Sequence, residues 1–345
     1  MEKNGDILKK MLEKDAKKVA SSLDFSQLEN KSVLITGASG LIGLNFLSSL
    51  LEISKNISGI TVYAVIHSDT SFFMETFLCA ENVTVFQGDL LDEHFVGTLP
   101  KADIIIHAAG SGIPERFLKN KLASLEINTT VVIKLFEKLN ADGKFLFISS
   151  SEVYSGLPDG KYSEDQIGMT NTNHPRACYI EGKKAGETIC NIYREMGVKA
   201  SSVRLSLTYG PGMLLSESRV LPSFILKALE GKIDLLDSGQ AFRTFCYISD
   251  AIEQMWFILL HGTQNLYNVG GVNHSTIGEL AELIGKMVHV PVHFPAKISG
   301  IDGASPYVDV DLNRIINESK KTTFVSLEDG LMNTINWYKQ LRGLF

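Results

Sequence analysis

Residues 32–43 read SVLITGASGLIG, and this stretch decides the fold. A short run of apolar and β-branched residues, which predicts a strand, ends in a turn with glycines at positions 37, 40 and 43, and an apolar helix is predicted over 41–51. Glycines at this spacing let the backbone turn tightly and approach a pyrophosphate, while the start of the helix offers free N–H groups to phosphate oxygens. The stretch therefore predicts a dinucleotide site made of Gly37, Ser39, Gly40, Leu41, Ile42 and Gly43.

Downstream of this stretch, short apolar runs alternate with segments of helix length. The predicted strands are 32–35, 61–66, 84–86, 103–107, 144–148 and 200–204. Strands separated by helices imply right-handed crossovers and a parallel sheet that is covered on both faces. We therefore expect an α/β fold, a doubly wound parallel (Rossmann) sheet with a smaller C-terminal α/β domain.

The domain boundaries follow from the same pattern. Residues 31–205 form the predicted Rossmann domain, and 240–262 return to it. The second domain comprises 206–239 and 263–345. Residues 1–30 are a helical extension, since apolar residues within 7–23 repeat at three and four residues. This helix either packs on the outside of the core or serves as a partner-binding arm.

Composition excludes several classes of protein. The 345 residues carry a net charge of −6, without the clustered Lys and Arg of a nucleic-acid binder. No apolar run reaches the length of about 18 residues that a membrane span needs. The cysteines have no C-x-x-C pair or His partner at metal spacing; they are Cys79, Cys178, Cys190 and Cys246. We expect a cytoplasmic protein with reduced thiols, no metal, and no nucleic-acid or membrane partner.

The ends of the second and third predicted strands carry further candidate cofactor contacts. His67 occupies the place where an acid usually binds the adenosine ribose. Asp69 either reaches the ribose hydroxyls from two residues on or is a loop carboxylate. Because no Arg lies near this turn to meet a 2′-phosphate, NAD is favoured over NADP. Asp89 and Leu90 are placed near the adenine, and a helix N-cap is an equally good interpretation of Asp89.

A second group of residues points to proton transfer. Tyr179 and Lys183 stand four residues apart in a predicted helix over 178–194, so both side chains emerge on one face. A nearby ammonium favours the phenolate and is expected to lower the pKa of the tyrosine, which would make it a general base for an alcohol. The serine turn 149–151 directly follows a predicted strand, at the carboxyl edge of the sheet where ligands bind.

With these motifs together, the sequence resembles the extended short-chain dehydrogenases/reductases, the NAD-dependent epimerase/dehydratase family. The resemblance covers about residues 31–290, and PRACYIEGKK at 175–184 is most similar to UDP-glucuronate decarboxylases. It also rests on His107-Ala108-Ala109, Asn128, the Ser-Glu before Val153-Tyr154, Arg204, Tyr209-Gly210-Pro211 and Tyr247-x-x-Asp250.

The resemblance implies roles for individual residues. The catalytic set would be Tyr179, Lys183, Ser150, Ser151, Glu152 and Arg243. NAD would also contact Ala108, Ala109, Asn128, Tyr179 and Lys183. Substrate contacts would be Pro114, Arg176 and Arg243, with a nucleotide sugar bound in the second domain. Arg176 is either such a contact or a lid on the start of its helix, and Arg243 is alternatively an interface or surface arginine. A homodimer through 128–138 and 179–193 is implied as well.

The implied reaction starts with oxidation of a sugar C4 by NAD, while Tyr179 takes the O4 proton. The 4-ketone then permits loss of CO2 from a C6 carboxylate, as in UDP-glucuronate decarboxylases. Loss of water with Glu152 as base (a 4,6-dehydratase) and 4-epimerisation are alternatives, and a catalytically silent NAD-binding protein is a more remote one. These decarboxylases usually carry Asn and Arg where this chain has Leu207 and Gly212, so the nucleotide and sugar stay open.

Overall fold

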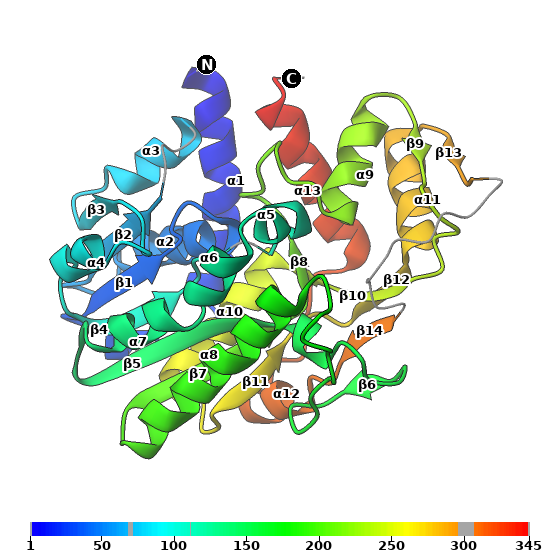
Figure 1. Ribbon diagram of the computed structural model, residues 1–345. Coiled ribbons are helices and arrows are strands. Elements are labelled where there is room, and N and C mark those ends of the chain that lie inside the picture. The colour runs from blue at the N-terminus through cyan, green and yellow to red at the C-terminus, as the bar shows by residue number, and fades with distance from the viewer. Residues whose placement is uncertain (1, 68–71, 111, 296–306, 344–345) are drawn as a thin grey trace.

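A parallel seven-stranded sheet forms the centre of the protein (Figure 1). The computed structural model describes residues 2–67, 72–110, 112–295 and 307–343. The strand order is β11-β7-β5-β4-β1-β2-β3, and every neighbouring pair is parallel. The strands are β1 (Ser32–Thr36), β2 (Thr61–Ile66), β3 (Val83–Gln87), β4 (Ala102–His107), β5 (Leu139–Ser150), β7 (Lys199–Leu205) and β11 (Leu266–Val269). The predicted doubly wound parallel sheet is confirmed.

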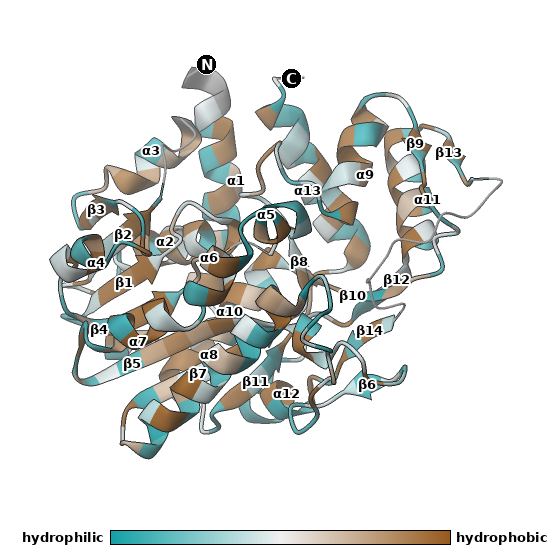
Figure 2. Ribbon diagram, viewed as in Figure 1, coloured by the Kyte–Doolittle hydropathy of each residue, from teal (hydrophilic) through white to brown (hydrophobic). Residues whose placement is uncertain are grey.

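Helices cover both faces of this sheet. One face carries α1 (Glu2–Ala20), α2 (Leu41–Ile53), α3 (Phe72–Leu78), α10 (Ile248–His261) and α12 (Asn313–Ser319). The other carries α4 (Glu93–Thr98), α6 (Lys121–Glu126), α7 (Thr130–Phe136) and α8 (Ala177–Glu195). Because side chains alternate along a strand, Val33 and Ile35 join one apolar core and Leu34 joins the other. The strands of the sheet are accordingly apolar on both faces (Figure 2).

A second, smaller set of elements comes mostly from the part of the chain after β7. Its sheet has the order β12-β10-β14-β6, and β8 pairs with β10. The strands are β6 (Lys161–Tyr162), β8 (Leu207–Tyr209), β10 (Phe242–Tyr247), β12 (Asn273–Thr276) and β14 (Tyr307–Val310). A separate pair joins β9 (Ile233–Asp234) to β13 (Val292–His293). The accompanying helices are α5 (Pro114–Lys119), α9 (Val220–Leu229), α11 (Ile277–Val288) and α13 (Leu327–Leu341), and single 3-10 turns lie at Ser26–Leu28 and Ser151–Tyr154.

The segment predicted to return to the large sheet is split between the two sheets. Within residues 240–262, β10 belongs to the small sheet, whereas α10 packs against β5, β7 and β11. The strand that extends the large sheet is β11, just beyond this segment, and it pairs Leu266 with Ser202. The division into two domains stays a prediction.

Helix α1 lies against α2, α10, α13 and α3 and buries Leu8, Leu12 and Val19. The first of the two interpretations, a helix packed outside the core, describes this arrangement. Its polar contacts are buried too: the Tyr247 hydroxyl donates to Asp15 at 2.7 Å. Among the described helices, none is long and apolar enough to cross a membrane.

We predict that Asp15→Asn changes how stability depends on pH. Burial raises the pKa of Asp15 to about 6 from 3.8, although the Tyr247 hydroxyl and Lys18 oppose the shift. Ionisation therefore costs more in the folded state, and the contribution of Asp15 to stability falls as pH rises from about 4 through about 6. Asn does not ionise, so the free energy of unfolding should shift in favour of the variant by up to about 3 kcal/mol across that range.

Urea denaturation at several pH values measures this difference. The matched control is Asp6→Asn, because Asp6 is an exposed carboxylate on the same helix. Parallel pH profiles for Asp15→Asn and the wild type would contradict the prediction.

Candidate active site

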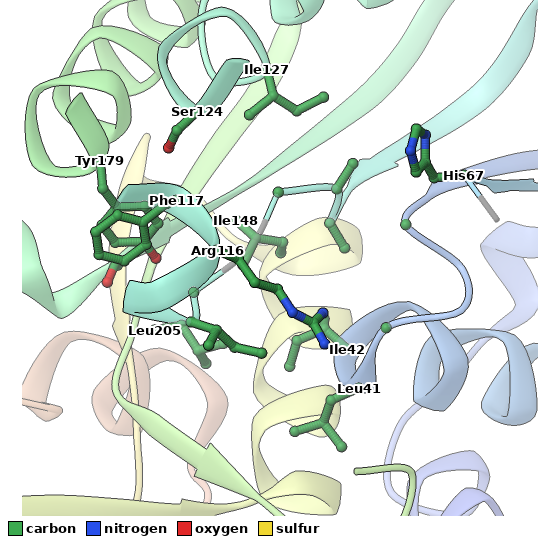
Figure 3. A pocket seen from close by; sticks show the side chains of 18 of the residues that line it. Leu41, Ile42, His67, Arg116, Phe117, Ser124, Ile127, Ile148, Tyr179 and Leu205 are labelled. Carbon is green, nitrogen blue, oxygen red and sulfur yellow. The ribbon is translucent and has the colours of Figure 1, made fainter. Parts of the chain in front are cut away.

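A cavity of about 590 Å³ opens at the carboxyl ends of the large sheet's strands (Figure 3). Its lining comes from the segments that follow β1, β2, β3, β4, β5 and β7. Fifteen of the predicted site residues line it: Gly37, Ser39, Gly40, Leu41, Ile42, His67, Asp89, Leu90, Ala108, Ala109, Ser150, Ser151, Glu152, Tyr179 and Lys183. The glycine turn and the tyrosine helix, far apart in sequence, therefore share one cavity.

The glycine turn has the geometry of a phosphate cradle. Gly37 has a φ of +68°, and a Cβ there would lie 2.8 Å from the carbonyl oxygen of Ala108. A Cβ at Gly43 would lie 2.2 Å from the carbonyl oxygen of Gly37. Gly43 therefore allows the first turn of α2 to pack closely against the glycine turn, and it does so without lining the cavity. Gly40 caps α2 without a side-chain hydrogen bond, so the first N–H groups of the helix stay available. These features fit a dinucleotide pyrophosphate.

The cavity's other end is lined by the residues after β2 and β3. His67 is exposed and lies at the end of β2 (Figure 3). Asp69 lies outside the described residues. The Asp89 carboxylate accepts a hydrogen bond from the Leu91 N–H at 2.9 Å and so closes a turn, whereas the N-cap of α4 is Asp92. The alternative of a helix cap for Asp89 is therefore wrong.

Tyr179 and Lys183 lie on one face of α8, as their spacing predicts. The Lys183 ammonium donates to the carbonyl oxygen of Ile148 at 2.7 Å and lies 5.7 Å from the centre of the Tyr179 ring. The ring of Phe117 stacks on that of Tyr179, with 4.7 Å between ring centres. A Cβ added to Gly112 would lie 3.7 Å from the Tyr179 hydroxyl, so this backbone closes the site above the phenol.

Burial controls the charges of this pair. It raises the pKa of Tyr179 to about 12, with a further increase from the charge of Glu152, while a hydrogen bond with Ser150 opposes the shift. Burial also lowers the pKa of Lys183 to about 7, against the charge of Glu187. The pKa of Tyr179 is thus raised in the chain by itself and not lowered as expected, because desolvation outweighs the hydrogen bond with Ser150 and the charges of Arg219 and Arg176.

The end of β5 brings a carboxylate into the same cavity. The Glu152 N–H donates to the Ser150 Oγ at 3.2 Å, and its carboxylate forms an ion pair with Arg176. Burial raises the pKa of Glu152, and the charges of Arg176 and Arg243 oppose that rise. Arg176 is also the residue that caps α8, so it joins the helix start to the serine turn.

Several predicted contacts do not line the cavity. They are Gly43, Pro114, Asn128, Arg176 and Arg243. Pro114 is the first residue of α5. Asn128 is buried and donates to the Ser124 carbonyl oxygen at 2.7 Å, while its Oδ1 has no partner among the described residues. Arg176 nevertheless contacts two lining residues, since it pairs with Glu152 and lies 5.6 Å from the centre of the Phe117 ring. The charge of Arg243 acts on Glu152.

A buried ion pair lies one turn beyond Lys183 on the same face of α8. Arg204 donates to both carboxylate oxygens of Glu187, at 3.0 Å and 2.8 Å, and the Ser149 hydroxyl donates to Glu187 at 2.5 Å. The same guanidinium donates to the carbonyl oxygens of Glu164 and Gln166. Arg204 therefore ties β7, α8 and the 164–166 loop together, and it does not line the cavity.

Arg116, Phe117 and Arg219 are among the lining residues that were not predicted from the sequence. The Arg116 guanidinium donates to the Ser216 hydroxyl at 3.2 Å and points toward the start of α2 (Figure 3). Arg219 pairs with Glu217 at 2.9 Å. The sequence signal that could have indicated Arg116 was a basic residue just after Pro114, in the segment that follows β4.

The two departures from the decarboxylase pattern both line the cavity. Leu207 begins β8. Gly212 has a φ of +106°, and a Cβ there would lie 3.0 Å from the Asn45 amide nitrogen. An arginine at this position would be strained, because side chains rarely adopt that backbone conformation.

Comparisons with known proteins agree with this geometry. The sequence pattern of the NAD dependent epimerase/dehydratase family matches residues 33–270. UDP-glucuronic acid decarboxylase 1 of Xenopus tropicalis is 27% identical over 325 residues, which cover 91% of this chain and 74% of that protein. The dTDP-glucose 4,6-dehydratase of Streptomyces niveus is 25% identical over 320 residues, 90% of this chain and 93% of that one.

Solved structures are similar in fold. UDP-glucuronic acid 4-epimerase from Bacillus cereus, in complex with UDP-glucuronic acid and NAD, superposes with a TM-score of 0.75 at 24% identity, covering 90% of this chain and 99% of that one. The dTDP-glucose 4,6-dehydratase from Bacillus anthracis, in complex with NAD, superposes with a TM-score of 0.74 at 20% identity. The match covers 91% of this chain and 98% of that one.

We predict that Arg204→Met destabilises the protein by about 3–5 kcal/mol, because it leaves the buried Glu187 carboxylate without its cation. Chemical denaturation measures the loss. Adding Glu187→Leu to that variant should restore much of it, since removing both charges removes the unpaired one. The matched control is Lys232→Met, which breaks the exposed Lys232–Asp234 pair and should cost under about 1 kcal/mol. Equal losses for Arg204→Met and Lys232→Met would refute the structural role of Arg204.

Proposed function

Because the chain belongs to the NAD dependent epimerase/dehydratase family, we propose that it is a lyase that removes CO2 from a nucleotide sugar with a C6 carboxylate. The activity would resemble that of UDP-glucuronate decarboxylases and pass through a 4-keto sugar. The observation that carries this proposal is the grouping of Glu152 with Arg176 and Arg243 next to Tyr179. Guanidinium groups are the partners that a substrate carboxylate would need for charge-assisted hydrogen bonds.

NAD is the cofactor, and we assign its pyrophosphate to the glycine turn and the start of α2. When bound, NAD supplies the acceptor and later the donor for the two electrons exchanged with the sugar. The backbone N–H groups of Leu41 and Ile42 are placed to hold its phosphates. His67, Asp89 and Leu90 line the end of the cavity that we assign to its adenosine.

We assign the proton of the sugar O4 to Tyr179. The phenol is buried, and Ser150 and Lys183 lie beside it. Since burial raises the pKa of this phenol to about 12, it must gain positive charge nearby before it can hold the O4 proton. Lys183 supplies part of that charge, because its ammonium is fixed by the Ile148 carbonyl oxygen and favoured by Glu187. A bound oxidised nicotinamide would add further positive charge beside the phenol.

The 4-ketone makes a C6 carboxylate a β-keto acid. As the bond from C5 to C6 breaks, its electrons move into an enolate at O4, and CO2 leaves. We assign the enolate oxygen to the hydroxyls of Tyr179 and Ser150, which form a preorganised donor pair. Before CO2 leaves, Arg243 pairs with the C6 carboxylate. Alternatively, Arg243 helps to return a proton to C5 after CO2 has left.

Dehydration is the second candidate, and a specific observation favours it. Burial raises the pKa of Glu152, which makes its carboxylate a stronger base toward the C5 proton of a 4-keto sugar. If C6 bears a hydroxyl, that proton abstraction would expel water. The similarity to a dTDP-glucose 4,6-dehydratase agrees with this possibility. Epimerisation at C4 would give the Glu152 carboxylate no role in the reaction.

We also propose that the protein is a cytoplasmic homodimer. The supporting feature is apolar surface on helices that pack against each other, α6, α7 and α8. Leu122 is 68% exposed, and Ile133 and Ile192 are 43% and 50% exposed. A second copy of the chain would cover these side chains.

We predict that the protein with NAD releases CO2 from UDP-glucuronate, detected as a loss of its mass in a panel of UDP-, GDP-, CDP- and dTDP-sugars. NMR identifies the products. Loss of water from a hexose would support the dehydratase, and a new 4-epimer without a mass change would exclude both lyases. Tyr179→Phe should lower turnover by about 10²–10⁴-fold, because it removes the acid–base group, while NAD affinity stays close to that of the wild type. Undiminished turnover would remove Tyr179 from the mechanism.

We further predict that Arg116→Gln weakens NAD binding about tenfold, the loss of one charge-assisted hydrogen bond. The reason is that the guanidinium points toward the start of α2, where we assign the pyrophosphate (Figure 3). Calorimetry with NAD and with adenosine measures the effect, and Ser216→Ala is the control that removes only the partner of Arg116. If adenosine binding falls as much as NAD binding, Arg116 shapes the loop and does not contact phosphate.

A further inference from the structure

A second hollow, of about 350 Å³, lies at the amino-terminal end of β7, away from the carboxyl ends that form the first cavity. Three of its lining side chains are cations: Lys144 on β5, Lys199 on β7 and Arg194 in the last turn of α8. All of its lining residues lie in the described part of the chain, and none of them is Asp or Glu. Three positive charges therefore gather in a chain whose net charge is −6.

The sheet itself brings two of these charges together. Lys144 and Lys199 are Cα partners in the parallel pair β5–β7, so their side chains leave the same face next to each other. Like charges directly opposite in a sheet are destabilising. Burial lowers the pKa of Lys144, and the charge of Lys199 lowers it further. No lining carboxylate relieves this repulsion.

Hydrogen bonds hold two of the cations in place. The Lys144 ammonium donates to the Leu260 carbonyl oxygen at 3.0 Å and to the Gln27 side chain at 2.8 Å. The Arg194 guanidinium donates to the carbonyl oxygens of Ala200 and Thr263. An ammonium has three N–H donors and a guanidinium has five, so both keep donors in reserve. The Lys199 ammonium has no partner among the described residues.

We propose that this hollow binds a phosphate dianion, either inorganic phosphate or the phosphate of a small monoester. A compact dianion accepts charge-assisted hydrogen bonds from all three cations and cancels the repulsion between the two lysines. The volume of the hollow leaves room beside the phosphate for a small organic group. This proposal does not rest on the proposed lyase activity.

The two sites share structural elements. Strand β5 carries Lys144 in the hollow and Ser150 in the active-site cavity, and helix α8 carries Arg194 at its end and Tyr179 at its start. An anion that binds only the folded chain stabilises these elements by mass action. Thermal unfolding therefore reports binding directly, without an assay of turnover.

The test is thermal unfolding of the NAD-saturated protein during titration with sodium phosphate, against sodium chloride at equal ionic strength. Saturation with NAD keeps phosphate out of the glycine turn. At about ten times its Kd, phosphate should raise the Tm by about 2 °C beyond chloride. Because phosphate also stabilises proteins by exclusion from their surfaces, variants must separate binding from that general effect.

Lys199→Gln is the discriminating variant, and Lys286→Gln, an exposed lysine on α11, is its matched control. In chloride, Lys199→Gln should unfold at the same temperature as the wild type or higher, because it removes a like charge beside Lys144. Its gain with phosphate should disappear, and calorimetry should show at least about tenfold weaker phosphate binding. Lys286→Gln should keep the full gain. Equal phosphate effects in the two variants, or none beyond chloride in the wild type, would overturn the proposal.

A parallel titration with glycerol 3-phosphate distinguishes the sources of the anion. Binding of the monoester that is as tight as that of phosphate, and that Lys199→Gln weakens, assigns the site to phosphorylated metabolites. Binding of inorganic phosphate alone assigns it to the free ion. If Lys199→Gln weakens neither ligand, the hollow is not their site.

Discussion

The close approach of the glycine turn to the end of β4 is the constraint on which the site depends. The chain leaves β1 at Gly37 with a positive φ, and any side chain there would collide with the backbone of Ala108 and Ala109. Strand β1 lies between β2 and β4. The chain therefore adds β2 and β3 on one side of β1 and β4 on the other side, and this change of direction opens a crevice at the carboxyl ends of the strands. The start of α2 and the ends of β4 and β5 all face this crevice. The glycine turn forms part of the wall of this crevice.

The charges of the site are balanced across several elements. Lys183 is buried between the Ile148 carbonyl oxygen and the Glu187 carboxylate, and Glu187 is in turn held by Arg204 and Ser149. Such a chain of buried partners fixes the position of α8 against β5 and β7, because each unpaired charge would be costly. By itself it does not lower the pKa of Tyr179, since burial acts more strongly on the phenol than any neighbouring charge. The buried partners of Lys183 and Glu187 therefore fix the position of α8, whereas burial of the phenol determines the pKa of Tyr179.

Local sequence predicted the parts of the fold that local physics controls. Strand β1, the glycine turn after it and the one-sided placement of Tyr179 and Lys183 all follow from backbone geometry within a few residues. Strand β11 was missed, because four residues carry too little pattern and the strand depends on pairing with β7. Arg116 was missed because α5 turns back over the cavity only in the folded chain. The pKa of Tyr179 was misjudged for the same reason: burial by Phe117 and Gly112 is a property of distant segments.

The arrangement separates the groups that we propose to react from the cations that line another part of the cavity. Ser150, Tyr179 and Lys183 stand on β5 and α8, which the large sheet and the Glu187–Arg204 pair hold rigidly. The cations Arg116 and Arg219 stand on segments that follow β4 and β8, where the chain also departs from the decarboxylase pattern at Gly212. The backbone conformation of Gly212 and its contact with Asn45 leave little room for an arginine there. Positive charge in the cavity of this chain therefore comes from Arg116 and Arg219 and not from position 212.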